Sequence, residues 1–310
     1  MTTATLTGAE EITWNLGDLY AGMDDPQLNA DLDAADAEAD ALDREYRGRI
    51  AGLSASELAE MIGRFEALQE RAGRVGSFAS LNWTGNTQDP ARGALLQRVT
   101  ERGSQLGQKL VFLELELANA PDEVAAAWLA DPALTRYSHW LEVVRLFRPH
   151  LLSEAEEKIL DEKSVTGRSA WDRFFDETHG ASRYELDGEK LTRDQVLNRL
   201  YAGDRELRRR AAAAVTAGLK DLSRTNTYIF NTILADKASD DRLRKYSSWI
   251  SARNLSNQVD DKTVDALVEA VTSRYDIVAR YYRLKRRLLG LDELFEYDRY
   301  APLPAADRRY

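Results

Sequence analysis

Residues 24–47 read DDPQLNADLDAADAEADALDREYR, and this stretch already indicates the fold class. Its apolar residues recur at steps of four and three, which is the apolar stripe of an amphipathic helix. Nine acids and two arginines lie among the other positions, so most of the negative charge would face water. The stretch therefore predicts a long helix that buries one side. The stripe consists of Leu28, Leu32, Ala35, Ala39, Leu42 and Tyr46.

Two further stretches repeat this pattern downstream. Ser54 or Ser56 is placed to cap a second helix that stops near Gly85-Asn86, and Asp89-Pro90 opens a third. Long helices joined by short loops pack as antiparallel neighbours. Gly103 and Gly107 lie four residues apart in the third helix, where glycine lowers helix propensity. They predict a close crossing with a neighbouring helix.

Shorter elements follow in the middle of the chain. Pro121 starts a short helix that Asp131-Pro132 breaks, and Ser153 with Glu156 has the spacing of a capping box. Asp187-Gly188 suits a type I′ turn, so residues 184–191 predict a β-hairpin. Thr192 with Gln195 repeats the capping box and predicts a helix to about Tyr201.

The last third of the chain predicts two more long helical stretches. One runs from Asp204 to about Lys237, and the other from Asp260 or Asp261 to Gly290, with a strand expected around residues 295–300. The expected fold is thus mainly α, with long antiparallel helices and one small β-hairpin. The short segment Trp14–Tyr20 is expected to anchor the N-terminus through its aromatic residues.

Composition excludes several classes of protein. The 310 residues are 44% hydrophobic and 30% charged, as in globular proteins. The net charge of −10 argues against nucleic-acid binding, which needs clustered positive charge, and against binding an anionic membrane. No run of about 18 apolar residues is present. The chain has no cysteine, and residues 1–11 lack the basic start and apolar core of a secretory signal, so we expect a cytoplasmic protein.

A search for catalytic chemistry begins with metal ligands. A helical zinc site of the H-E-x-x-H type needs two histidines four residues apart on one helix face. The three histidines are His139, His150 and His179, so no such pair exists. The simpler interpretation is that His139 packs beside aromatic neighbours and that the other two lie near turns.

Other catalytic patterns are weaker still. The segment Gly167–Trp171 resembles a nucleophile elbow around Ser169 but has Trp171 where the second glycine is required, and its surroundings indicate a helix. Glycine-rich phosphate-binding loops are absent from the sequence. Three acid pairs could act as general acid and base, but each is better explained as a charge near a helix start. These pairs are Glu156-Glu157, Asp240-Asp241 and Asp260-Asp261.

A basic cluster near the end of the chain is the best candidate for an anion or substrate contact. Arg280, Arg283 and Arg287 share one helical face, beside Lys285 and Arg286. Such a stripe is more often a solvated surface. The residues alone therefore define no catalytic, cofactor-binding or metal-binding site.

Several long strings resemble one protein family. Residues 152–160 read LSEAEEKIL, 163–171 KSVTGRSAW and 186–192 LDGEKLT. The N-terminal string WNLGDLY (14–20) also resembles the family. Later strings that resemble it are IFNTILADK (229–237), SARNL (251–255), RYYRLK (280–285), LLGL (288–291) and YDRYAPL (297–303). Together these strings, spread over nearly the whole chain, resemble the oligoendopeptidase F family of thimet-type zinc metallopeptidases.

The resemblance implies a function and a domain organisation. Family members are helical, clam-like enzymes that cleave short peptides in a deep channel with zinc on an H-E-x-x-H helix. Residues 1–203 would be the N-terminal helical domain, and residues 204–310 the opening helices of a zincin-type peptidase domain. The implied cofactor is zinc, and the implied partners are short peptides and the remainder of the peptidase domain.

The sequence departs from the family pattern because it ends before any H-E-x-x-H motif. No metal ligand or catalytic residue can therefore be assigned, and we expect the chain alone to be inactive and to form part of the channel wall. The alternative is a non-catalytic helical scaffold or peptide-binding module. If a missing half covers the last helices, the isolated chain should expose a large apolar patch.

Overall fold

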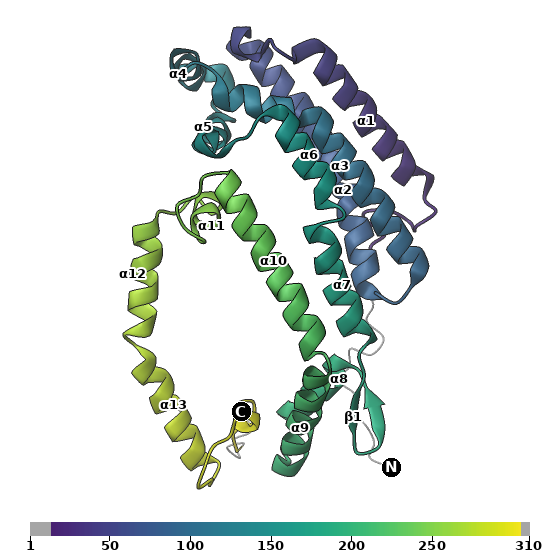
Figure 1. Ribbon diagram of the computed structural model, residues 1–310, viewed down its shortest axis with the longest axis vertical. Coiled ribbons are helices and arrows are strands. Elements are labelled where there is room, and N and C mark those ends of the chain that lie inside the picture. Colours follow the sequence, from purple (N-terminus) through teal and green to yellow (C-terminus); the bar gives the residue numbers. More distant parts are fainter. Residues whose placement is uncertain (1–13, 305–310) are drawn as a thin grey trace, which may run out of the picture. The chain divides into compact units, whose positions relative to one another are not determined.

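The computed structural model describes residues 14–304 and is 74% helical, with a single two-stranded antiparallel sheet (Figure 1). The predicted fold class is therefore confirmed. Residues 1–11, where no secretory signal is expected, lie outside the described part, and so do residues 305–310. Among the described helices, none combines the length and the apolar character that crossing a membrane requires.

The chain divides into two compact units, Met1–Val165 and Thr166–Tyr310. The border predicted from the family, between residues 203 and 204, lies inside the second unit. Elements on both sides of that position share one core, because the hairpin and the helix after it pack on the helix that begins at Arg205. The family-based border stays a prediction, and each compact unit is described by itself.

Three long helices form the body of the first unit. Two of them begin at predicted caps, because Ser54 and Glu57 form a capping box and Asp89 precedes a proline. The first is capped by Asp25, whose side chain accepts from the Gln27 amide. The capping contacts satisfy amides that have no partner within the helix. The helices are α1 (Pro26–Tyr46), α2 (Ala55–Gly85) and α3 (Pro90–Asn119).

The core of the first unit lies where these helices pack side by side. The predicted stripe of α1 is confirmed, since Leu28, Leu32, Ala35, Ala39 and Leu42 are all buried. Shorter elements complete the first unit. They are η1 (Ile50–Gly52), α4 (Asp122–Ala130), η2 (Pro132–Leu134), α5 (Ser138–Leu146), η3 (Arg148–His150) and α6 (Glu154–Ser164).

The N-terminal segment is held by a tyrosine rather than by its tryptophan. Tyr20 is buried, its ring meets Phe78 edge-on, and its hydroxyl donates to Asp31 at 2.7 Å. Arg74 also donates to the carbonyl of Leu19 at 2.8 Å. Trp14 is 81% exposed. The expected aromatic anchor is therefore Tyr20.

The two glycines of α3 differ in their surroundings. A Cβ added to Gly107 would lie 2.8 Å from Oδ2 of Asp161 on α6, so the predicted close crossing is confirmed there. A Cβ added to Gly103 would meet nothing within 4 Å, so the prediction is wrong for that residue. Only Gly107 is required by packing.

We expect Gly103→Ala to raise the free energy of unfolding by about 1 kcal/mol, because alanine is the better helix former and finds open space. Gly107→Ala gains the same propensity but presses on the Asp161 carboxylate. Urea denaturation of both variants checks this. Equal stabilisation by the two substitutions would contradict the assignment of the crossing to Gly107.

Asp161 itself is a destabilising charge at neutral pH. Burial, together with Glu162 and Glu157, raises its pKa, and its Oδ2 is buried without a hydrogen-bond partner among the described residues. A carboxyl group whose pKa is raised in the folded state favours folding more as the pH falls through that pKa. Asp161→Asn should therefore be more stable than the parent at pH 7, with a difference that shrinks in acid. Denaturation midpoints measured from pH 4 to 8 test this, and a constant difference would contradict it.

The second unit contains the hairpin and the later helices. Its helices are α7 (Arg168–Ala181), α8 (Arg193–Asn198), η4 (Arg199–Tyr201), α9 (Arg205–Asp221), α10 (Ser223–Leu243), α11 (Ser251–Ser256), α12 (Asp261–Thr272), α13 (Tyr275–Leu288) and η5 (Glu296–Asp298). Its strands are β1 (Tyr184–Leu186) and β2 (Glu189–Leu191).

The hairpin forms as its turn residues predict. Asp187 and Gly188 both have positive φ, 53° and 84°, as a type I′ turn requires. Tyr184 pairs with Leu191, and both side chains are buried against α8 and α9. The hairpin thus covers one side of a small hydrophobic core that includes α9.

Three sequence predictions in this unit need correction. The stretch from Asp204 is two helices, because Leu222, with ψ of −6° instead of the roughly −42° of an α-helix, forms a turn between them. The second helix also runs past Lys237 to Leu243. The stretch from Asp260 is likewise interrupted between α12 and α13. The strand expected at residues 295–300 is wrong: the Asp298 carboxylate accepts from the Phe295 amide and closes the turn η5.

Candidate functional site

The histidines do not form a metal site. Within residues 14–304, no three His, Asp or Glu side chains lie close enough together to hold a metal ion. His139 lies on α5 and His150 on η3, whereas His179 lies at the end of α7. His179 is buried, with Nε2 3.1 Å from Oδ1 of Asn226 and its ring against Phe175. The residues described here do not fit the zinc that the family resemblance implies.

The elbow-like segment is the start of a helix. Gly167 is the residue before α7, and Ser169 lies exposed in its first turn. A nucleophile elbow needs a strand before the turn, but α6 precedes it. The helical interpretation of this segment is confirmed.

The acid pairs have structural partners. Glu156 completes the capping box of Ser153, and Asp260 accepts from the Thr263 amide at the start of α12. The third pair is not at a helix start, as the sequence suggested, but at the end of α10. There Asp241 pairs with Lys237 at 2.7 Å and Asp240 with Arg244 at 3.0 Å.

The basic cluster lies on α13, where Arg280, Arg283 and Arg287 are exposed. Lys285 differs from them, because it is buried and donates to the carbonyl of Arg299 at 2.7 Å. Burial lowers the pKa of Lys285, and Arg208 adds to the effect. Lys285 thus joins α13 to the segment after it, and it is not part of the solvated stripe.

Apolar side chains on α12 and α13 are unusually exposed. No residue of α12 is buried, and on α13 only Lys285 is. Leu267 is 63% exposed and Tyr281 49%, although the spacing of these residues is that of a core-facing stripe. Exposed apolar side chains, as expected of uncovered helices, are therefore present on both. Together we call them the apolar surface of α12 and α13; they are Leu267, Val268, Val271, Ile277, Tyr281, Leu284 and Leu288.

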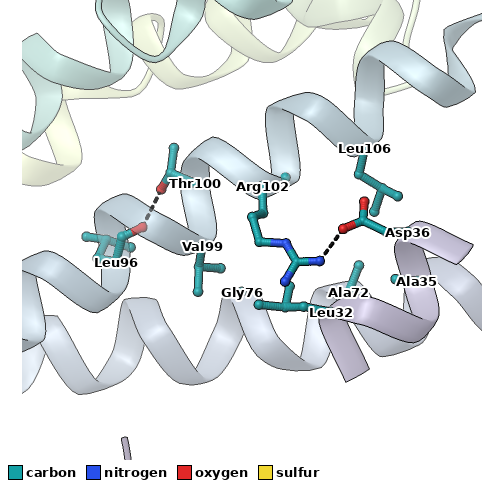
Figure 2. Close-up of a pocket in the computed structure, with 11 residues that line it drawn as sticks. Leu32, Ala35, Asp36, Ala72, Gly76, Leu96, Val99, Thr100, Arg102 and Leu106 are labelled. Carbon is teal, nitrogen blue, oxygen red and sulfur yellow. Dashed lines mark hydrogen bonds and ion pairs between the residues drawn. The ribbon is translucent and has the colours of Figure 1, made fainter. Parts of the chain in front are cut away.

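A cavity of about 180 Å³ lies among α1, α2 and α3 (Figure 2). Its polar side chains already have partners. Arg102 is hydrogen-bonded to Asp36 and to Asp33, and Thr100 donates to the Leu96 carbonyl at 2.8 Å. The rest of its lining is aliphatic or glycine, including Gly76 and Gly103, so this cavity offers apolar space without a reactive group.

A second cavity, of about 430 Å³, lies between α7 and α10. Its lining combines two carboxylates, an amide and four apolar side chains. No sequence motif indicated this cavity, although the segment Trp171–Asp176 places two acids one helical turn apart with two phenylalanines between them. We call it the α7–α10 pocket. It is lined by Asp172, Phe175, Asp176, Asn226, Ile229, Phe230 and Ile233.

Comparisons with known proteins agree with one another. The family model described as Oligopeptidase F matches residues 116–184. Oligopeptidase PepF of Bacillus subtilis is 28% identical over 301 residues, which cover 94% of this chain and 44% of that protein. The oligoendopeptidase F homolog of Lactococcus lactis is 24% identical over 97% of this chain and 51% of its own length. The chain thus spans about half the length of the curated relatives it matches.

A solved structure shows the same fold. The crystal structure of oligoendopeptidase-F from Enterococcus faecium superimposes with a TM-score of 0.79 and 20% identity, over 89% of this chain and 56% of that one. Family model, relatives and structure point to a single family. The resemblance to the oligoendopeptidase F family is therefore confirmed, over a length consistent with the N-terminal half of its members.

Proposed function

We propose that this chain is the N-terminal portion of a zinc-dependent oligoendopeptidase that hydrolyses short peptides. The observation that carries the proposal is similarity along almost the whole chain to proteins named oligopeptidase or oligoendopeptidase F. These relatives are about twice as long as the region matched. In this proposal the chain contributes fold and peptide-binding surface, while the rest of the enzyme contributes the chemistry.

The metal ligands would lie in the part of the relatives that this chain does not match. Zinc in a peptidase supplies a Lewis acid and an activated water, and it needs three protein ligands. The described residues provide no such group. We therefore assign no catalytic role to His139, His150 or His179, and we predict that the chain alone is inactive.

The apolar surface of α12 and α13 supports the proposal that this chain holds only part of a domain. Two amphipathic helices with almost no buried residue lack the partner that their pattern requires. The relatives carry about as much chain again beyond the matched length. We propose that the remainder of the peptidase domain covers this surface.

A second candidate is a non-catalytic peptide-binding module, and the α7–α10 pocket favours it. Both candidates are consistent with a cytoplasmic location, which stays a prediction.

The coding sequence that follows the Tyr310 codon separates the two candidates. An in-frame H-E-x-x-H motif with a downstream glutamate supports the oligoendopeptidase. A stop codon with no such motif in the adjoining reading frames would contradict it and leave the peptide-binding module.

A further inference from the structure

The α7–α10 pocket is built from one face of each helix. Asp172, Phe175 and Asp176 are spaced i, i+3 and i+4 on α7, so they point to the same side. The residues contributed by α10 follow the same spacing, from Asn226 to Ile233. The two helices pack against each other within the second unit. The pocket is therefore a feature of regular helix packing rather than of a loop.

The charged side chains that line the α7–α10 pocket are all negative. Among the lining residues there are two carboxylates and no lysine or arginine. Asp172 has only a long, exposed contact of 3.8 Å with Arg168, and within the described chain Asp176 has neither a hydrogen bond nor an ion pair. Burial and the neighbouring Asp172 raise the pKa of Asp176, while His179 opposes the rise. A positively charged ligand group would relieve this repulsion.

The remainder of the lining is apolar and aromatic. Ile229 is buried at the base, whereas Phe175 and Phe230 keep 37% and 63% of their surface exposed. Apolar walls offer no ligand atom to a metal ion, and within residues 14–304 no third ligand lies close enough to complete a site. A guanidinium group fits both features, because it pairs with carboxylates through two parallel hydrogen bonds and stacks on aromatic faces.

We propose that the α7–α10 pocket binds the arginine side chain of a short peptide, with the guanidinium on Asp176 and the aliphatic stem against Phe175, Ile229 and Phe230. The charge complementarity and the mixed lining identify the occupant. The proposal rests on the proposed function in one respect: it takes the ligand to be a peptide. Exposed Tyr228 and Leu234, on the same helix, would contact residues beside the arginine.

Calorimetric titration of the purified chain tests this with three capped pentapeptides that differ only at the central residue. The residues are arginine, its neutral isostere citrulline and lysine, and the capped ends leave the side chain as the sole cation. We expect the arginine peptide to bind roughly tenfold more tightly than the citrulline peptide, as for a charge-assisted hydrogen bond. Lysine should be intermediate, because it forms no bidentate pair.

Variants locate the binding site. Asp176→Asn should weaken arginine binding roughly tenfold, and Phe230→Ala should weaken arginine and citrulline peptides alike. Asp265→Asn removes an equal charge from an exposed position of α12 and should leave affinity unchanged. Circular dichroism of each variant establishes that it is folded.

Equal affinity for arginine and citrulline peptides would overturn the proposal, as would equal losses in Asp176→Asn and Asp265→Asn. Absence of binding by the folded chain would also overturn it. None of these outcomes bears on peptide hydrolysis, because the titration does not measure turnover. Conversely, a coding sequence without a zinc motif would refute the oligoendopeptidase and leave the arginine pocket standing.

Discussion

Replacing Asp298 by alanine is expected to lower the free energy of unfolding of the second unit by about 3–5 kcal/mol. Asp298 is fully buried and accepts from Arg208 at 2.8 Å and from Arg205 at 2.9 Å. Arg208 is itself buried and also donates to the carbonyls of Tyr297, Ala202 and Gly203. Removing the carboxylate leaves the Arg208 charge buried without its counter-ion, which is the costly way to break a buried pair.

The same pair predicts a pH dependence. Burial alone would raise the pKa of Asp298, but hydrogen bonds from Arg205, Arg208 and the Phe295 amide outweigh it and the pKa is lowered. Its stabilising contribution is thus present above the pKa of the unfolded chain, about 4, and is lost as the pH falls through the lower folded value. The difference between parent and Asp298→Ala should be large at pH 7 and shrink below about pH 4.

Urea denaturation monitored by hydrogen exchange in α9 measures both effects. Arg209→Ala is the control, because its pair with Glu206 is exposed on both sides and should contribute little. A loss in Asp298→Ala no larger than in Arg209→Ala would show that the buried pair does not hold η5 to α9.

Phe112→Ala should destabilise the first unit by about 3–5 kcal/mol, as large-to-small substitutions in a packed core do. Phe112 is 1% exposed, and the Arg47 guanidinium lies 4.4 Å from its ring centroid. Arg47 also pairs with Asp43 in α1 and with Glu154 in α6. The ring therefore supports an ion-pair cluster that joins three helices.

Phe112→Leu separates the two contributions. It keeps most of the apolar volume but removes the aromatic face, so it should cost less than about 1.5 kcal/mol. Combining it with Arg47→Met in a double-mutant cycle isolates the contact between ring and guanidinium. A loss in Phe112→Leu as large as in Phe112→Ala would contradict a packing origin.

Local signals in the sequence predicted most helix starts. Caps at Ser54, Ser153 and Thr192 act through neighbouring amides, so their effect can be read from spacing alone. The turn at Asp187-Gly188 has the same local character. Of helix α7, the sequence indicated only the first residues around Ser169, because the apolar residues that follow are few.

Long-range contacts could not be predicted in the same way. Asp298 meets Arg208 across 90 positions, and no local pattern indicates that pairing. The α7–α10 pocket likewise joins residues about 50 positions apart in the chain. The spacing of Asp172 and Asp176 can be read from the sequence, but their proximity to α10 cannot. The interruptions at Leu222 and before Tyr275 fall within continuous apolar periodicity, which is why the sequence predicted single helices.

Zinc content and peptide turnover of the purified chain test the central claim, that these residues contribute binding surface and not metal chemistry. After dialysis against zinc and then metal-free buffer, we expect far less than one zinc ion per chain. We also expect no cleavage of an internally quenched oligopeptide. One tightly held zinc ion per chain, with cleavage that a chelator abolishes and zinc restores, would contradict the account.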